Sequence, residues 1–354
     1  MEWYRLRAAG IKDNVTGKLM ERLEHYEDIF KLDREQLKFY FGFSDDVVNL
    51  IYHSKETDLE SAVKKYTDLG INILCIKDKE YPENLKNISH PPLFLFYKGD
   101  LSLADGKNIG IVGTRRATVY GRNACEKIVD ELVAAGVTTV SGLAAGIDSI
   151  CHKRTLAKNG KTIAVVGSGL DVIYPAENKK YWEIIGKEGL LISEYPLGTP
   201  PNTFNFPRRN RIIVGLSKGI TVVESKEKGG SLITAYLALE EGRDVFAVPG
   251  DIYSPASMGT NELIKKSEAK LVTSGKDILI EYGWETGMTK EISCAVPLDE
   301  NEKKIYNTLS VERNLDEIIM ETGIKAGNAL AILMDMEIKG IVSSIIGGKY
   351  RRKK

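Results

Sequence analysis

Between about residue 107 and residue 250, six short runs of apolar residues alternate with segments of helical periodicity. The runs are Ile109–Val112, Val137–Val140, Thr162–Val166, Leu190–Ile192, Ile220–Val223 and Val245–Val248. Strands that are apolar along their whole length are typical of a parallel sheet covered on both faces, because half-exposed strands alternate polar and apolar residues. The alternation therefore predicts a doubly wound α/β domain with a mainly parallel sheet over about residues 105–282.

The first 70 residues show a different pattern, in which apolar residues recur at helical spacing. Examples are Leu19, Leu23, Tyr26, Phe30, Val47, Val48, Ile51 and Tyr52. Turn signals at Asp13-Asn14 and at Gly42-Phe43-Ser44 separate the helices. We predict a small helical module over residues 1–70. Two strands, Asn72–Ile76 and Leu93–Tyr97, then begin a central domain over residues 71–285.

The end of the chain predicts a third domain. Met288–Asp299 is mixed in composition and is expected to be the linker. Three helices are predicted after it, and Gly347-Gly348 then separates two strand-like segments, which indicates a hairpin. Three helices followed by a hairpin predict a winged-helix-like module over residues 295–354. The helices are Glu302–Leu309, Leu315–Thr322 and Ala326–Lys339.

The last six residues, Lys349–Lys354, hold five cations and no acid. A basic tail beside a wing can contact phosphates, but a solubilising terminus has the same composition. The third helix of this module displays alanine, leucine and methionine rather than the polar side chains of a recognition helix. A protein contact therefore fits that helix at least as well as a DNA contact.

The composition excludes several classes of protein. The chain has 354 residues, of which 49 are Lys or Arg and 49 are Asp or Glu, so zero net charge gives no argument for a nucleic-acid partner. No stretch approaches about 18 consecutive apolar residues, and no signal peptide is recognisable, so we expect a cytoplasmic protein without a membrane segment. The four cysteines form no C-x-x-C pair and the four histidines do not cluster, so we expect neither a metal nor a cofactor.

Small-residue turns follow several of the predicted strands. They are Gly113-Thr114-Arg115, Ser141-Gly142, Gly167-Ser168-Gly169 and Gly229-Gly230-Ser231. In doubly wound sheets ligands bind beyond the carboxyl ends of the strands, where such turns present backbone N–H groups and helix N-termini. The turns predict an anion or phosphate pocket, whereas the glycine pattern of neither dinucleotide-binding nor P-loop proteins is complete.

The distribution of charge indicates a partner that the net charge does not. Tyr195–Val223 contains no Asp or Glu, and its four prolines predict an extended loop in its first half. Aromatic rings beside arginines are typical of a single-strand site, where bases stack and guanidinium groups hold phosphates. The competing interpretation is a helix start with Phe206 in the core and one arginine paired with Glu224. The candidate binding residues are Phe206, Arg208, Arg209, Asn210, Arg211 and Lys218.

Two acidic residues, Asp148 and Glu224, are candidates for a catalytic role. Asp148 and His152 share a helix face at a spacing of four residues, but a structural role is the more economical interpretation, in which Asp148 accepts hydrogen bonds from backbone N–H groups. Glu224 lies near the Gly-Gly turn and could act on a ribosyl substrate. A nucleotide-processing enzyme of the nucleoside-phosphate hydrolase class is therefore the alternative function, and the absence of a convincing acid/base pair argues against it.

Seven collinear motifs across about residues 80–275 resemble the DprA/Smf family of DNA-processing proteins. They include Ile111-Val112-Gly113-Thr114-Arg115, Ser141–Asp148 with His152, Gly167–Pro175, Ser193–Pro196, Phe206–Ile213, Gly230–Ala235 and Ala247–Gly250. The resemblance implies an extended Rossmann-like domain that binds single-stranded DNA without cutting it and loads the RecA recombinase during natural transformation. It also implies a homodimer formed through that domain. The helical module, of the SAM or helix-hairpin-helix type, and the winged helix resemble appendages of this family.

The resemblance also assigns roles to residues of this chain. Arg115 is expected to hold a phosphate, helped by Gly113, Thr114, Ser141 and Gly142. Phe206–Arg211 is expected to line the same groove, with Gly230 and Ser231 as backbone donors, and Lys218 to extend it. Ala145 stands where the family often has arginine, which removes one possible DNA contact.

Overall fold

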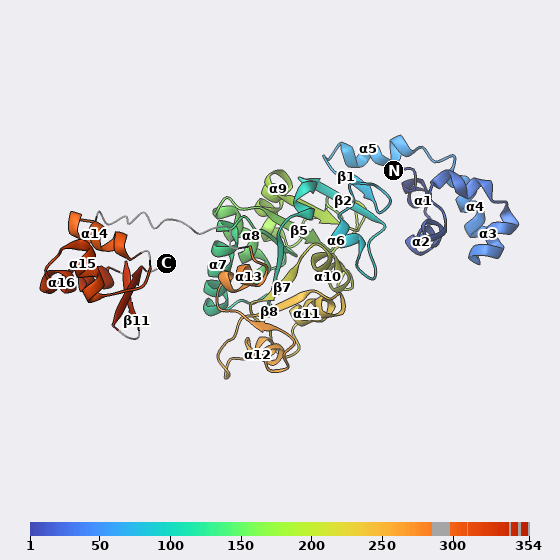
Figure 1. The fold of residues 1–354 in the computed structure, drawn as a ribbon. Helices are drawn as coiled ribbons and strands as arrows, with labels where there is room; N and C mark the ends of the chain where they lie inside the picture. The colour runs from blue at the N-terminus through green and yellow to red at the C-terminus, as the bar shows by residue number, and fades with distance from the viewer. Residues whose placement is uncertain (285–297, 310, 340, 346–347, 353–354) are drawn as a thin grey trace. The chain divides into compact units, whose positions relative to one another are not determined.

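The structure is a computed structural model that describes residues 1–284, 298–309, 311–339, 341–345 and 348–352. Contacts divide the chain into two compact units, Met1–Trp284 and Glu285–Lys354, which are treated separately below (Figure 1). The expected linker Met288–Asp299 lies outside the described residues except for its last two, and so does Cys294. No helix among the described residues is long and apolar enough to cross a membrane.

The larger unit is built on a nine-stranded sheet with the order β1-β2-β6-β5-β4-β3-β7-β8-β9. The seven strands from β6 to β9 pair in parallel, and β2 pairs antiparallel with β1 and β6. The sheet confirms the predicted Rossmann-like fold, including its six apolar strands. The bounds are β1 Asn72–Cys75, β2 Phe94–Gly99, β3 Asn108–Val112, β4 Thr138–Ser141, β5 Thr162–Val166, β6 Leu190–Ser193, β7 Gly219–Val222, β8 Asp244–Ala247 and β9 Lys270–Leu271.

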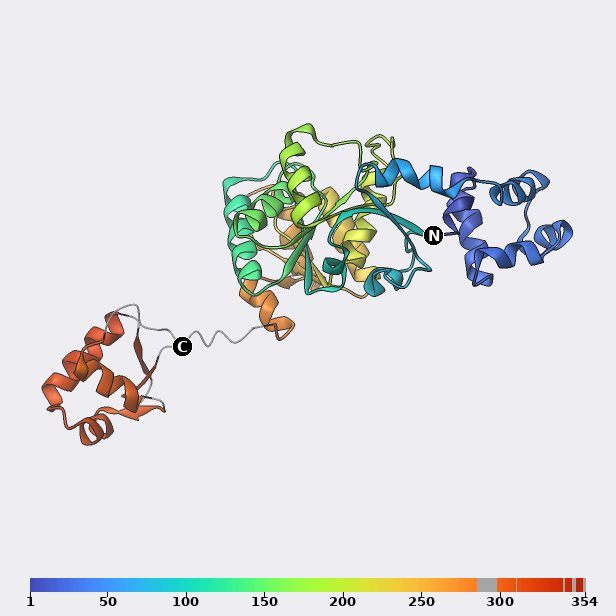
Figure 2. The same ribbon diagram turned by 90° about the horizontal axis from the view of Figure 1, so that it is seen from above.

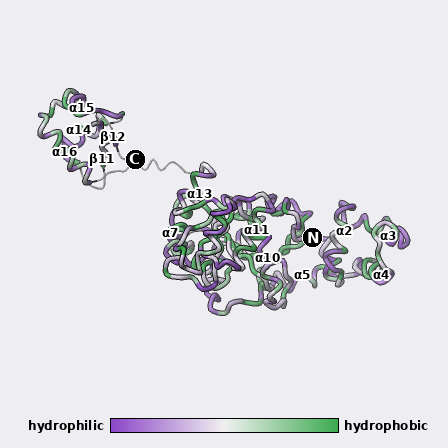
Figure 3. The backbone as a smooth tube through the Cα atoms, turned by 90° about the horizontal axis from the view of Figure 1, so that it is seen from below, coloured by the Kyte–Doolittle hydropathy of each residue, from purple (hydrophilic) through white to green (hydrophobic). Residues whose placement is uncertain are grey.

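Helices cover both faces of this sheet (Figures 1 and 2). Helices α7, α8, α9 and α13 lie on one face, and α6, α10 and α11 on the other, each with its own apolar core. The hydropathy view shows hydrophobic residues concentrated inside this unit (Figure 3). The bounds are α6 Glu83–Lys86, α7 Val119–Ala134, α8 Ile147–Ala157, α9 Lys179–Glu188, α10 Asn205–Gly215, α11 Gly230–Glu240, α12 Met258–Lys265 and α13 Gly275–Glu281, with 3-10 turns η2 Leu101–Asp105 and η3 Ala176–Asn178.

The N-terminal segment is helical, as predicted, but it shares its apolar core with the sheet. The ring of Tyr4 contacts the edge of Phe94 in β2 at a centroid distance of 5.5 Å. The turn predicted at Asp13-Asn14 is wrong, because these residues begin α2, where the Asp13 carboxylate favours the positive end of the helix dipole. The bounds are α1 Tyr4–Ala8, α2 Asp13–Arg22, η1 Tyr26–Lys31, α3 Arg34–Phe41, α4 Asp45–Ser54 and α5 Leu59–Thr67.

The described residues of the smaller unit form three helices and a three-stranded sheet of order β10-β12-β11, which confirms the winged-helix prediction. Its core is made by Ile305, Ile318, Leu333 and other buried side chains. Arg352 lies 4.2 Å from the centre of the Tyr306 ring and donates from Nε to the Tyr306 carbonyl, so part of the basic tail is used inside the unit. The bounds are α14 Glu300–Thr308, β10 Arg313–Asn314, α15 Leu315–Thr322, α16 Ala326–Ile338, β11 Val342–Ile345 and β12 Lys349–Arg352.

Candidate nucleic-acid interface

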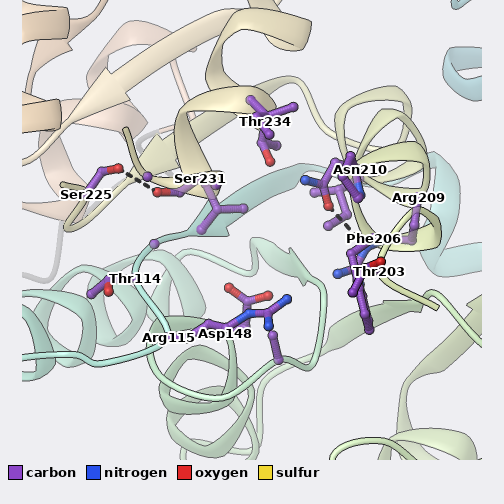
Figure 4. A pocket seen from close by; sticks show the side chains of 18 of the residues that line it. Thr114, Arg115, Asp148, Thr203, Phe206, Arg209, Asn210, Ser225, Ser231 and Thr234 are labelled. Atoms are coloured by element: carbon purple, nitrogen blue, oxygen red, sulfur yellow. Dashed lines mark hydrogen bonds between the residues drawn. The ribbon is translucent and has the colours of Figure 1, made fainter. Parts of the chain in front are cut away.

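The strand order reverses at β3. Strands β4, β5 and β6 lie on one side of it, and β7 and β8 lie on the other. Loops that follow the two strands at such a reversal diverge, and the crevice between them is the usual ligand site of doubly wound sheets. A pocket of about 440 Å³ occupies this position, with Gly113–Arg115 after β3 on one side and residues of the Ser225–Ser231 segment after β7 on the other (Figure 4).

Helix α10 forms a further wall of the pocket. The extended loop predicted for the first half of Tyr195–Val223 is right only to Phe204, because α10 begins at Asn205. Pro207 does not prevent this, since an N–H group in the first turn has no helical acceptor to lose. Phe206 and Asn210 line the pocket from the first turns of this helix.

The helical register sends the three arginines of this motif in different directions. Arg209 is only 4% exposed, and its Nη1 donates to the carbonyl oxygens of Gly142 (2.7 Å) and Val165. Arg211 pairs with the buried Glu194 carboxylate, whereas Arg208 remains exposed. The competing interpretation of this segment was therefore right about a helix start with one paired arginine. It was wrong about Phe206, which lines the pocket rather than the core, and about the acid, which is Glu194 rather than Glu224.

Arg209 and Asp148 balance each other electrostatically beneath the pocket. Burial raises the pKa of Asp148, and the nearby positive charge of Arg209 partly opposes that rise. Burial also lowers the pKa of Arg209 to about 10, against the effect of Asp148. A Cβ atom on Gly142 would lie 2.4 Å from both terminal nitrogens of Arg209, so glycine is needed there for the guanidinium to fit. Gly142 thus shapes the floor of the site and does not line the pocket.

Arg115 is an exposed cation of the pocket. Its guanidinium carbon lies 5.3 Å from the centre of the Phe206 ring, whose own centre is 5.6 Å from that of Tyr174. The ion pairs among the described residues do not include Arg115. A guanidinium held over a ring keeps its N–H groups at its edge, where they can bind a phosphate.

Among the described N-termini of α7, α8, α10 and α11, the first turn of α11 is the one that these contacts leave open to a ligand. The Glu224 carboxylate accepts hydrogen bonds from the backbone N–H (3.0 Å) and hydroxyl of Thr118 at the start of α7. The Ile147 N–H of α8 donates to the Thr114 carbonyl, and Pro207 removes a donor from α10. On Gly230 of α11 a Cβ atom would meet nothing within 4 Å, so an anion can approach the helix dipole there.

Of the three candidate catalytic groups, Asp148 lines the pocket, whereas His152 and Glu224 do not. Asp148 accepts a hydrogen bond from the Gly142 N–H (3.1 Å), which confirms its predicted structural role. His152 is fully buried and its Nδ1 contacts the Thr162 hydroxyl at 2.7 Å. Burial, reinforced by Arg209, lowers the pKa of His152 to about 3, because the imidazolium form loses its hydration. Both Glu224 oxygens are engaged by Thr118, so the candidate acid of the alternative enzyme is already bound.

The pocket brings together eight of the thirteen predicted site residues. These are Gly113, Thr114, Arg115, Phe206, Arg209, Asn210, Gly230 and Ser231. Ser141 is buried and donates to the Ile111 carbonyl, and Arg208 and Arg211 do not line the pocket either. Lys218 immediately precedes β7, so it lies at the amino edge of the sheet, opposite the pocket.

Sequence reasoning missed several lining residues. Tyr174 reaches the pocket from the loop after β5, Thr203 from the loop just before α10, and Lys226 from the loop after β7. The strand order that brings these loops together was the missing information. Lys226 could have been predicted, because a cation in the loop after a strand at the sheet reversal is well placed to reach the ligand site.

The comparisons with known proteins agree with this architecture. A family model described as DNA recombination-mediator protein A matches residues 72–283, and a DprA winged helix domain model matches residues 294–348. The chain therefore belongs to the class of DNA recombination-mediator proteins that this family model describes.

Individual relatives define the family more closely. DNA processing protein DprA of Streptococcus pneumoniae is 48% identical over 283 residues, which are 79% of this chain and 97% of that protein. Protein Smf of Synechocystis is 34% identical over 391 residues, which cover 100% of this chain and 98% of the Synechocystis protein. The chain belongs to the DprA/Smf family of DNA-processing proteins.

Solved structures give the same result. The X-ray structure of the Streptococcus pneumoniae protein superposes with a TM-score of 0.70 and 38% identity, covering 79% of this chain and 98% of that one. A Helicobacter pylori DNA processing protein A, whose structure concerns its binding of single-stranded DNA, superposes with a TM-score of 0.55 and 31% identity, covering 60% of this chain and 95% of that one.

Proposed function

We propose that the protein binds single-stranded DNA without sequence preference, with a backbone phosphate held in the pocket at the sheet reversal. The carrying observation is the juxtaposition of the exposed Arg115 guanidinium, stacked over Phe206, with the open first turn of α11. The guanidinium supplies charge-assisted hydrogen bonds, and the helix N-terminus supplies backbone donors and a positive dipole end.

The composition of the pocket favours a single strand over a duplex. The rings of Phe206 and Tyr174 lie beside the cation, and stacking of unpaired bases on such rings tolerates every base. The arginine expected to point into the groove, Arg209, is instead committed to buried carbonyl oxygens and cannot read base edges. The related Helicobacter pylori protein, whose solved structure concerns its single-stranded DNA binding mode, supports the same ligand class.

We further propose that the bound strand is protected and handed to the RecA recombinase during DNA uptake, in the cytoplasm and without catalytic turnover or a cofactor. Membership of a recombination-mediator family supports this role. A homodimer through the Rossmann-like domain fits the edge strand β9, whose Leu271 is 47% exposed. Edge strands with exposed apolar residues are sites of pairing between chains.

The test is a binding titration with labelled oligonucleotides of equal length, single- and double-stranded. We expect tighter binding of the single strand, and a loss on Arg115→Ala that is alike for every base composition. Arg34→Ala is the matched control, because Arg34 is also exposed and stacks over a ring, that of Tyr52, at 4.7 Å in the helical module. A base-selective loss, or equal losses in both variants, would contradict the phosphate role of Arg115.

The recombination step has its own measurement. With the protein present, a RecA recombinase should cover a single strand faster, and Arg115→Ala should lower this stimulation in parallel with its DNA affinity. Stimulation that survives the loss of DNA binding would contradict the proposed order of events.

A further inference from the structure

Two apolar side chains stand in solvent on the loop between β8 and α12. Tyr253 is 88% exposed and Ile252 is 74% exposed. The loop is held by several hydrogen bonds: the Asn261 side chain exchanges two with the backbone of Gly250 (3.1 and 3.0 Å), and the Tyr253 N–H donates to the Asp251 carboxylate (2.9 Å). An aromatic ring that an ordered loop holds in solvent indicates a contact surface.

This loop is continuous with the pocket at the sheet reversal. Strand β8 lies beside β7, so the loops after them are neighbours at the carboxyl edge of the sheet. The Gly259 N–H of α12 donates to the carbonyl of Ser225 (2.8 Å), which lines the pocket. On the other side, the Tyr120 hydroxyl of α7 donates to the Pro249 carbonyl. A chain that leaves the pocket over Lys226 therefore meets the β8–α12 loop next.

The charges along this path favour a polyanion. Arg116, Lys226 and Lys228 are exposed, and the ion pairs among the described residues include none of them. The acids on the two loops are Glu224, Glu227 and Asp251. Glu224 is buried and accepts hydrogen bonds from Thr118, and the Asp251 carboxylate already accepts the Tyr253 N–H. Exposed cations beside an exposed ring are the composition of a single-strand track rather than of an apolar protein contact.

We propose that a single strand bound in the pocket continues over the β8–α12 loop, where a base stacks on Tyr253 while Arg116, Lys226 and Lys228 contact the phosphates. This second subsite rests on the proposed function, because it extends the same strand. It makes the binding length-dependent: a short oligonucleotide fills the pocket alone, and a longer one also reaches the ring.

The test compares oligothymidylates of about 4 and about 15 nucleotides in fluorescence anisotropy titrations of the full chain. Tyr253→Ala should weaken binding of the long oligonucleotide about tenfold and leave the short one unchanged. Tyr253→Phe, which keeps the ring, should bind both as the parent does. Phe39→Ala is the matched control, because Phe39 is 84% exposed on α3. Arg115→Ala should weaken both lengths.

Each contrary result has one meaning. If Tyr253→Ala binds the long oligonucleotide within about twofold of the parent while Arg115→Ala fails on both lengths, the Tyr253 subsite is wrong and the proposed function stands. If the parent binds neither length, both are wrong. If Tyr253→Ala changes the molar mass in light scattering and weakens both lengths equally, the loop is a protein interface and the stacking subsite is again wrong.

Discussion

Replacing Arg209 by methionine distinguishes the structural role of Arg209 from the binding role proposed for Arg115, the other arginine that lines the pocket. Methionine fills much of the same space but removes the charge and the donors to the carbonyl oxygens of Gly142 and Val165. Asp148, which is 8% exposed, then keeps a buried carboxylate without a nearby cation. Two buried carbonyl oxygens lose their donor, and a buried carboxylate loses the positive charge that opposes the effect of burial, which together cost about 3–5 kcal/mol. Arg115→Ala removes an exposed side chain, so its effect on stability should stay within about 0.5 kcal/mol.

Urea unfolding followed by tryptophan fluorescence measures this loss cleanly. The three tryptophans of the chain, Trp3, Trp182 and Trp284, all belong to the larger unit, so the signal does not report the winged-helix unit. The expected result is a lower urea midpoint for Arg209→Met at unchanged slope, and parental stability for Arg115→Ala. Adding Asp148→Asn to Arg209→Met should recover part of the loss, because the unpaired charge is gone.

The pH dependence gives a second check on the same pair. Burial raises the pKa of Asp148 in the folded protein above its unfolded value, so the folded state takes up the proton more readily. Lowering the pH through this raised pKa neutralises the carboxylate, and the loss caused by Arg209→Met should therefore shrink. A loss below about 1 kcal/mol at neutral pH, or a double variant no more stable than the single one, would refute the charge balance.

Three further variants follow from the same contacts. His152 has a pKa of about 3 in the folded protein, so the unfolded chain binds more protons below its usual pKa of about 6.5. The larger unit should therefore lose up to about 1.4 kcal/mol per pH unit as the pH falls from about 6 to 4, and His152→Gln should flatten that slope in urea unfolding. Arg211→Met leaves the Glu194 carboxylate, 7% exposed, without its partner, so it should cost about 3 kcal/mol while the folded variant keeps its DNA affinity; an equal loss of DNA affinity would place Arg211 in the groove. Lys218→Ala should leave single-strand binding within twofold in an anisotropy titration, because Lys218 lies at the opposite edge of the sheet, and a larger loss would require a second DNA path.

The sheet was predictable because its strands are short, rich in apolar residues and buried along nearly their whole length. Because both faces are buried, the strands lack the regular polar–apolar alternation of half-exposed strands. All six predicted runs are strands, with boundaries within one residue. The N-terminal segment was harder, since a carboxylate such as Asp13 serves equally as a turn residue and as the first residue of a helix. Local propensity does not decide between the two.

The lining residues of the pocket were predictable in the turns after the strands. They were not predictable in α10, where the helix register determines which side chains face the pocket. The turns at Gly113–Arg115 and Gly230-Ser231 line the pocket because they follow the two strands at the sheet reversal. The arginines of α10 could not be assigned from composition, since successive helix positions point about 100° apart and Arg209 falls on the buried side. The acid-free stretch Tyr195–Val223 wrongly indicated that all of its arginines are unpaired. Glu194, the residue just before the stretch, pairs with Arg211.

The most direct test of the account is the salt dependence of single-strand binding in the parent and in Arg115→Ala. Each phosphate contact contributes about −0.7 to the slope of log affinity against log salt for a single strand. If Arg115 holds a phosphate, the variant binds more weakly and its slope is shallower by about 0.7, whereas the slope of the Arg34→Ala control equals that of the parent. An Arg115→Ala slope equal to the parental slope would contradict the phosphate pocket.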